Sequence, residues 1–410
     1  MGDLSLDESP GTISDLSRRG ARFSLARSLP SGVVEFDNFA FTGDHPGDDR
    51  SVLIGTAARF TLLDKAQIRA VYVRASEMLE PGNWRSDARR RGDVVGVIAR
   101  IDPYQGRLAF EGEADYALFD EDTSDAAPAV ADTSCRAKLG GSAQGYRYSA
   151  LYERTGPRYN IISGTEPRRD WEGYALGLGK EFGVHALELR LSRYNDNVKK
   201  NAESPVVYRY EGILEYNFKK IETLPLGFQY AKRVVQSVVE GGGRNGSGVD
   251  TIAGKMTYLA GEWDLGVRAS YLQRRNLASE ERDLAAATVA LAPKFNAGDV
   301  TVAPDFSLKR SFYLLERQRS DEYWAGLDIR GFALGRQLDY QLRGGVRKVL
   351  PESASGTTSV GGNVRLAYPL KRLLGALSAP TLGVRGEFNG VSDSWRREGN
   401  YSLLVVLEGR

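Results

Sequence analysis

Side chains that could do nucleophilic or metal chemistry are scarce in this chain. Its 410 residues include one cysteine, Cys135, and two histidines, His45 and His185. A single cysteine can form neither an intramolecular disulfide nor a cysteine zinc cluster, and hydrolase triads and histidine metal sites need imidazoles that are almost absent here. We therefore expect no catalytic residue, no metal and no cofactor.

The surroundings of these residues support that expectation. His185 follows a predicted tight turn, and His45 lies in the acidic loop 44–49, whose spacing matches no defined calcium loop. Gly246, Ser247 and Gly248 lack the strand-to-helix context that a nucleophile or phosphate site needs. Cys135 is interpreted as a small buried or lipid-facing residue. Any function must therefore come from other side chains.

Arginine is the most abundant charged residue in this chain. The chain has 42 arginines but only 13 lysines, with a formal net charge of +2. A guanidinium stays charged when it is partly buried, and it can donate two parallel hydrogen bonds to a carboxylate or a phosphate. A nucleic-acid partner would require a segregated basic face, and the balanced charge gives no reason to expect one. These features favour the binding of anions without covalent chemistry.

Twelve charged residues are the candidate site, because a two-residue alternation places them on polar strand faces. Arg343, Arg365 and Arg385 fall on three successive predicted strands, so they should be lateral neighbours about 5 Å apart per strand step. We expect a basic wall that faces an acidic wall and orients anionic solutes. Alternatively, the charges neutralise one another, as Asp339 or Glu387 could do with Arg365. The candidates are Arg268, Lys309, Arg330, Arg343, Arg347, Arg365, Arg385, Glu111, Glu113, Asp115, Glu211 and Glu215.

The elements that position these charges are predicted to be strands. Apolar residues alternate with polar ones in segments such as 263–271, 108–118, 212–218, 338–342 and 382–388. The 46 glycines and 20 tyrosines are typical of strands and turns. A mean hydropathy of −0.37 and the lack of any run of about 20 apolar residues exclude a bundle of membrane helices.

An alternating strand can bury its apolar side in a protein core or expose it to lipid. The predicted strands are about 10 to 14 residues long, whereas soluble sheets favour about 5 or 6 and membrane strands need about 9 to 11. Short and long connections alternate, as they do in outer-membrane barrels. The short turns are at 63–65, 102–105, near Gly145, 182–183, 220–223, near Glu262, 293–297 and 334–335; the long polar stretches are 42–50, 76–91, 121–133, 155–170, 195–204, 238–248, 276–282, 316–320, 351–356 and 392–399.

Aromatic residues near the predicted strand ends fit the interfacial girdles of a membrane barrel. The alternative is that they belong to the core of a soluble sheet. The residues concerned are Tyr146, Trp171, Tyr194, Tyr258, Trp263, Tyr323 and Tyr401.

These observations predict an all-β fold. Residues 19–410 should form a single transmembrane, antiparallel, up-and-down β-barrel of about 18 to 20 strands, with 16 to 22 possible, short periplasmic turns and long extracellular loops. About 21 candidate strands can be counted, the weakest being 21–29 and 33–41. A barrel of this size encloses water. Residues 1–18 are expected to be a flexible leader or the remnant of an upstream region, and 369–380, with Leu373, Leu374 and Leu377, a short helical plug or foot.

The alternation over 401–409 resembles the last strand of outer-membrane barrels, whose pattern finishes with Phe or Trp. Arg410 departs from that pattern, so we expect a terminal aromatic residue beyond it. No secretory signal precedes Gly2, so we expect the start of a mature or truncated protein.

In general organisation the chain resembles bacterial exopolysaccharide-export porins, such as the alginate export porin and the barrels that follow tetratricopeptide regions in cellulose secretion. The resemblance rests on topology, loops and arginine content. It implies an outer-membrane location, a polysaccharide cargo cradled by the lumen arginines, periplasmic secretion components as partners, and an inward-folded gate from 155–170 or 76–91. The alternatives are a general or substrate-specific porin for small solutes, a receptor or adhesin that acts through its loops, and a soluble all-β binding protein.

Overall fold

A computed structural model describes most of the chain. The described residues are 2–6, 9, 11–13, 16–42, 51–62, 65–78, 89–161, 168–201, 204–238, 244–353, 355–369, 381–392 and 397–408. The predictions for His45, for Leu373, Leu374 and Leu377, and for Arg410 therefore lie outside the described residues.

The chain divides into two compact units, each of which is described by itself. Unit 1 comprises Met1–Lys180, Glu188–Gly212 and Val234–Asn245, and unit 2 comprises Glu181–Leu187, Ile213–Arg233 and Gly246–Arg410.

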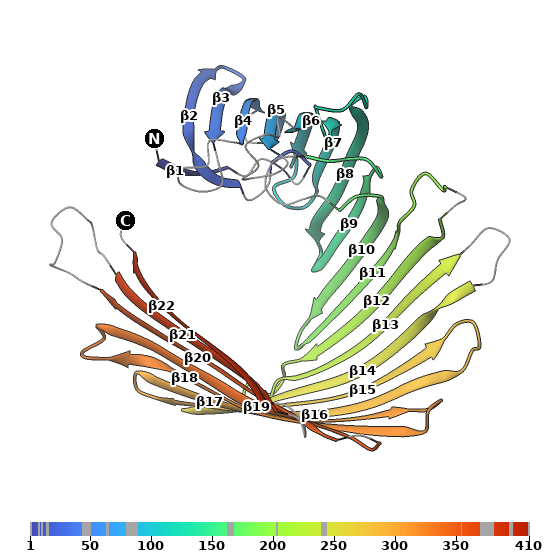
Figure 1. Cartoon of the computed structure of the whole chain (residues 1–410), viewed down its shortest axis with the longest axis vertical. Coiled ribbons are helices and arrows are strands. Elements are labelled where there is room, and N and C mark those ends of the chain that lie inside the picture. The colour runs from blue at the N-terminus through green and yellow to red at the C-terminus, as the bar shows by residue number, and fades with distance from the viewer. Residues whose placement is uncertain are drawn as a thin grey trace. The chain divides into compact units, whose positions relative to one another are not determined.

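Both units consist of antiparallel strands that pair in chain order (Figure 1). Unit 1 contains β1 (Gly2–Leu6), β2 (Leu16–Leu29), β3 (Gly32–Thr42), β4 (Val52–Leu62), β5 (Ala66–Met78), β6 (Arg89–Ile101), β7 (Ala109–Asp120), β8 (Val130–Ala143), β9 (Tyr146–Thr155) and most of β10 (Trp171–Phe182). Both units share β11 (His185–Asn195), β12 (Val206–Phe218), β13 (Leu226–Val238) and β14 (Arg244–Ala260). Unit 2 contains β15 (Trp263–Asn276), β16 (Arg282–Ala297), β17 (Val300–Tyr313), β18 (Gln318–Ala333), β19 (Leu338–Pro351), β20 (Thr357–Pro369), β21 (Thr381–Ser392) and β22 (Arg397–Glu408).

The predicted all-β, antiparallel, up-and-down fold is confirmed. The described residues form 22 strands, the upper end of the predicted range, and β1 is a short strand of five residues. The other strands have 10 to 17 residues, which is longer than soluble sheets favour. Within the described residues, no helix is long and apolar enough to cross a membrane.

Short and long connections alternate between β7 and β12 and between β14 and β17, but not throughout: 219–225 is longer than 239–243, and 314–317 and 334–337 have the same length. Turns of two residues join β2 to β3, β10 to β11, β14 to β15 and β16 to β17, while 156–170 and 196–205 join their strands at the other end. Gly183, Gly261 and Gly298 occupy these turns with positive φ, a conformation that strains residues with a Cβ atom.

The predicted turn at 293–297 is wrong, because these residues lie inside β16 and the turn is at 298–299. Strand β16 continues through Pro293. The β16–β17 ladder is interrupted between the pairs Leu291–Phe306 and Phe295–Val302, where Pro293 would meet Pro304. Proline cannot donate to a ladder, so the pairing opens locally without ending the strand.

In the strands of unit 2, such as β15, β16 and β17, one face is apolar and the other carries charged residues. In unit 2, cross-strand pairing places Val267 beside Leu291 and Leu291 beside Phe306, all on the apolar face. The side chains of Tyr271, Val289 and Phe306 on this face are 47%, 49% and 48% exposed. The opposite face, called the charged face below, carries residues such as Arg268 and Lys309. The alternation predicted from the sequence is therefore realised.

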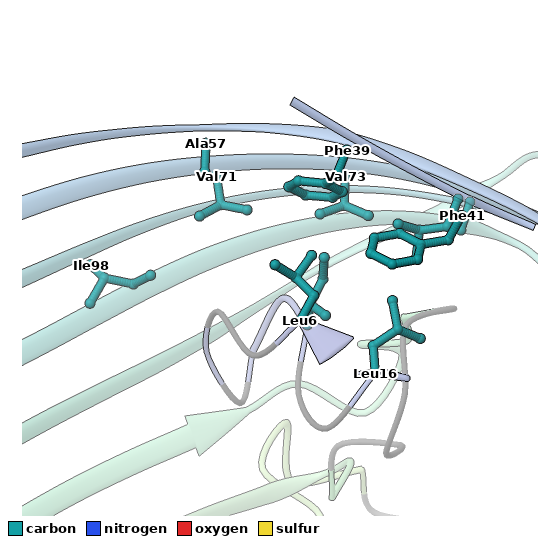
Figure 2. Close-up of a cluster of buried hydrophobic side chains, with 11 residues drawn as sticks. Leu6, Leu16, Phe39, Phe41, Ala57, Val71, Val73 and Ile98 are labelled. Carbon is teal, nitrogen blue, oxygen red and sulfur yellow. The ribbon is translucent and has the colours of Figure 1, made fainter. Parts of the chain in front are cut away.

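The start of the chain differs from the expected flexible leader. Strand β1 pairs with β2, in the register of Gly2 with Gly20 and Leu6 with Leu16. Figure 2 shows Leu6 and Leu16 beside Phe39, Phe41 and Val73 in a buried cluster. The described residues between 2 and 16, called the N-terminal segment, cover part of the charged face of unit 1, because their apolar side chains find apolar partners there.

Candidate functional site

In unit 1, the N-terminal segment lies directly on two carboxylates of the charged face. Glu113 and Asp115 are two residues apart on β7, so they lie on the same face, and both are buried. The Gly11 amide donates a hydrogen bond of 3.0 Å to Glu113 Oε1. A Cβ atom on Gly11 would lie 2.0 Å from Asp115 Oδ2. With any other residue at position 11, the segment or these acidic side chains would have to shift.

Part of the loop between β9 and β10 folds onto the same region. Tyr159 is fully buried in a cluster with Val94, Ala117 and Ile161, and its hydroxyl donates a 2.5 Å hydrogen bond to the Gly11 carbonyl. Burial, followed by the nearby Asp115 and Glu113 carboxylates, raises the pKa of Tyr159 above its usual value, so its hydroxyl remains a donor. The described part of 155–170 thus lies against the charged face of unit 1, and its role as a gate stays a prediction; most of 76–91 lies outside the described residues.

Toward the short turns, the charged face of unit 1 contains a cavity of about 570 Å³. Three cations line it, Lys65, Arg100 and Lys138, together with the acids Asp102 and Glu111. Arg100 Nε lies 3.0 Å from Glu111 Oε2, and Arg136 lies 3.8 Å from Glu111 Oε1. Since Glu111 is shared between two arginines, the cavity offers positive charge to an anionic solute.

In unit 2, the charged face carries the predicted arginines. Arg365 and Arg385 are directly opposite each other across β20 and β21, whereas Arg343 is opposite Asn363, two positions from Arg365. Arg365 and Arg385 are therefore direct lateral neighbours, as predicted, whereas Arg343 is only a diagonal neighbour of Arg365. Two further candidates are paired with acids: Arg347 lies 2.7 Å from Glu322, and Arg330 lies 3.8 Å from Asp328.

Arg343 and Arg365 differ from these paired arginines. Both side chains are exposed, and no carboxylate among the described residues lies within ion-pair distance of either one. The neutralising pair of Asp339 with Arg365 is therefore not formed, although both residues lie on the charged face. An arginine that is solvated and lacks an acidic neighbour can attract a passing anion.

A second cavity, of about 230 Å³, lies in unit 2 and is lined by two neighbouring cations. Lys255 and Arg268 are directly opposite each other on β14 and β15, and both line this cavity with Glu215. Glu215 accepts a 3.1 Å hydrogen bond from Gln229. One carboxylate thus stands beside two cations, which gives this part of the face a positive balance.

The predicted acidic and basic residues mostly lie in different units. Glu111, Glu113, Asp115 and Glu211 belong to unit 1, whereas Glu215 and all the predicted lysine and arginine candidates belong to unit 2. Lys309 is opposite Glu322 on the next strand. Whether an acidic wall faces a basic one stays a prediction, because it concerns the placement of one unit against the other.

Sequence reasoning missed several residues that line the charged faces. Arg100, Lys138 and Lys255 follow the same alternation as the predicted candidates, so a complete count of polar-face positions would have found them, whereas Lys65 lies in the predicted turn 63–65 before β5. Tyr159 and Gly11 carry no such local signal. Their roles depend on contacts between segments far apart in the sequence.

His185 and Cys135 are the described histidine and cysteine of the chain. His185 Nδ1 lies 2.7 Å from the Tyr216 hydroxyl, and its ring packs against Phe182 and Phe218. Cys135 is half-buried on β8. Among the residues that the structure describes, no group of three or more His, Cys, Asp or Glu side chains could hold a metal ion.

No protein-family model and no curated protein matches the sequence. Among solved structures, OccK1 (OpdK) of Pseudomonas aeruginosa is 15% identical, with 79% of this chain and 93% of that chain covered and a TM-score of 0.42. OpdK with vanillate, from the same organism, is 14% identical, with 85% of this chain and 99% of that chain covered and a TM-score of 0.43. Outer-membrane expressed OmpT of Vibrio cholerae is 13% identical, with 71% of this chain and 91% of that chain covered and a TM-score of 0.34. At these TM-scores we derive neither family nor function from these similarities.

Proposed function

We propose that this chain is a channel of the bacterial outer membrane that passes polar, preferentially anionic solutes. The observation that carries the proposal is the contrast between the two faces of its long antiparallel strands. One face exposes large apolar side chains such as Tyr271, Val289 and Phe306, and the other exposes Arg343 and Arg365. Strands of this kind span a membrane with the apolar face toward lipid and the charged face toward water.

Lipid is the medium that stabilises the apolar face. Exposed apolar surface costs about 25 cal/mol per Å² in water, and soluble proteins rarely expose contiguous apolar patches above a few hundred Å². Here, exposed rows run along consecutive strands, as from Val289 to Leu308 and from Leu308 to Tyr323. A soluble all-β protein would have to cover these rows with a second layer.

The cations on the charged faces support a preference for anions. Within the part of the chain that the structure describes, Arg343 and Arg365 have no acidic partner, and Lys65, Arg100 and Lys138 outnumber the acids around their cavity. Fixed positive charge beside an aqueous path raises the local concentration of anions.

The cargo favoured by the structure is a small solute. The N-terminal segment and Tyr159 already occupy part of the charged face of unit 1, which narrows the room for a polymer. Export of a polysaccharide, with secretion components as partners, follows from the resemblance alone and stays a prediction. A receptor that acts through its loops is the other alternative.

Planar-bilayer recording tests the proposal. The double variant R343Q/R365Q should form channels whose anion-to-cation permeability ratio is several-fold lower than that of the wild type, because two lumen charges are lost. The control R336Q removes a charge from the turn between β18 and β19 and should leave the ratio unchanged. An unchanged ratio in the double variant would leave the loops to explain function. Protein that stays monodisperse in water without amphiphiles would overturn the channel itself.

A further inference from the structure

Arg193 is an arginine on the apolar face of β11. It continues the alternating series Leu187, Leu189 and Leu191, of which Leu187 and Leu191 are exposed. The residues between them point to the other face, where Glu188 and Arg190 form a 2.7 Å ion pair. A charge on the lipid-facing side of a strand is costly unless it reaches the interface or a partner.

Three tyrosines surround this arginine. The guanidinium carbon lies 5.9 Å from the ring centroid of Tyr174, 5.1 Å from that of Tyr208 and 5.9 Å from that of Tyr210. They come from β10 and β12, the strands before and after β11 in the chain. Cation–π contacts of this kind orient the guanidinium and hold it at the surface, but they do not neutralise its charge.

Among the described residues, no carboxylate lies within ion-pair distance of Arg193. Glu188, on the other face of β11, pairs with Arg190, and Glu172, on the same face of β10 as Tyr174, accepts a 2.9 Å hydrogen bond from the Tyr152 hydroxyl. The guanidinium therefore keeps N–H donors and a full positive charge for a group outside the protein.

The cluster lies at one particular level of the strands. Arg193 is two residues before the end of β11, Tyr208 is two residues after the start of β12, and Tyr174 is three residues after the start of β10. These strand ends all meet the long connections 156–170 and 196–205. At about 3.3 Å per residue, Arg193, Tyr174 and Tyr208 are within about 10 Å of the strand ends and Tyr210 within about 13 Å, where aromatic girdles meet lipid headgroups.

We propose that Arg193, held between Tyr174, Tyr208 and Tyr210, binds the phosphate of a lipid headgroup in the leaflet next to the long loops. This inference rests on the proposed membrane-spanning function. A guanidinium donates two parallel N–H bonds to phosphate oxygens, and tyrosine hydroxyls supply further donors at the same level. The acyl chains of the same lipid would lie along Leu187, Leu189 and Leu191.

Native mass spectrometry of the full chain in detergent, titrated with bisphosphorylated lipid A, tests this site. R193Q should lower the affinity for the lipid about tenfold, because it removes the charged bidentate donor. R193K keeps the charge but loses the fork, so its loss should be smaller. R190Q, a change on the other face of the same strand, should bind lipid like the wild type. Folding of each variant is checked by circular dichroism.

Three outcomes overturn the inference while the channel stands: R193Q binding lipid as well as wild type, R190Q losing as much affinity as R193Q, or inorganic phosphate competing at concentrations comparable to the lipid. Failure of the proposed function looks different. In that case the wild type and every variant would remain dispersed without detergent and would retain no lipid.

Discussion

The charged faces of the two units differ in what covers them. In unit 1 the N-terminal segment buries Phe39, Phe41, Val71 and Val73, together with the carboxylates of Glu113 and Asp115. In unit 2 the described hydrophobic residues that are buried are alanines, Ala253 and Ala286, and Arg268, Arg343 and Arg365 are exposed. The backbone pattern is the same in both units, so the presence or absence of the N-terminal segment determines which residues the charged face can hold.

This difference separates two roles of one strand architecture. The covered face of unit 1 has the composition of a protein core with a few buried charges, and such a face holds its cover in place. The open face of unit 2 keeps small residues and solvated arginines, which suits contact with a mobile solute. The first region should respond to substitutions with changes in stability, and the second with changes in selectivity.

The largest expected effect on stability concerns the N-terminal segment, which covers part of the charged face of unit 1. I13A removes a fully buried side chain from the cluster with Phe39 and Phe41 and should destabilise the docked segment by about 2 to 5 kcal/mol. Urea unfolding in detergent measures the loss, and single-channel conductance should rise as the segment leaves the charged face. The control L342A changes an exposed position of unit 2 and should cost about 0.5 kcal/mol or less. Equal losses in the two variants would erase the distinction between the units.

A smaller effect is expected where the segment approaches β7. G11A would place a Cβ atom 2.0 Å from Asp115 Oδ2 and 2.7 Å from Glu113 Oε1, so the segment must shift, at about 1 to 3 kcal/mol. In unit 2, G254A is the matched control, because its Cβ atom would meet nothing within 4 Å. Unfolding midpoints of the two variants provide the measurement. A G11A midpoint equal to that of G254A would mean that the acids and the segment are not in close contact.

The hydrogen bond from Tyr159 gives a finer test. Y159F keeps the buried ring but leaves the Gly11 carbonyl without this donor, which should cost about 1 to 2 kcal/mol. In unit 2, the Tyr230 hydroxyl donates a 2.7 Å bond to Asp250 on the next strand, where solvent can replace it, so Y230F should cost less. If Y230F were the more damaging change, burial would not be what distinguishes the two bonds.

The contrast between the units also explains how far the sequence predicted the structure. Segments 263–271 and 338–342 alternate cleanly because only one of their faces is apolar, and the structure confirms their strands. Strand β3 was among the least secure predictions. Its Phe36 is exposed on one face while Phe39 and Phe41 are buried on the other, so the apolar residues do not share one face.

The site was predictable to a similar extent. Alternation identified Arg343 and Arg365, whose register follows from adjacent strands. It could not reveal that the N-terminal segment would cover Glu113 and Asp115, because the contact between Gly11 and Glu113 spans 102 residues. Local periodicity specifies the face of a residue, whereas long-range packing determines whether that face is covered.

The smallest expected effect concerns pH at the turn between β16 and β17. In unit 2, Arg336 donates hydrogen bonds to Asp299 and lowers the pKa of that carboxyl below its ordinary value of 3.8. A depressed folded-state pKa adds stability that is present above the unfolded pKa and is lost as the pH falls through the folded pKa. The unfolding midpoint of the wild type should therefore fall slightly more than that of D299N between about pH 5 and pH 2. Since both side chains are exposed, the difference should shrink at high salt. A difference that survives high salt would mean that the turn is shielded from solvent, and the open character assigned to unit 2 would then not extend to this rim.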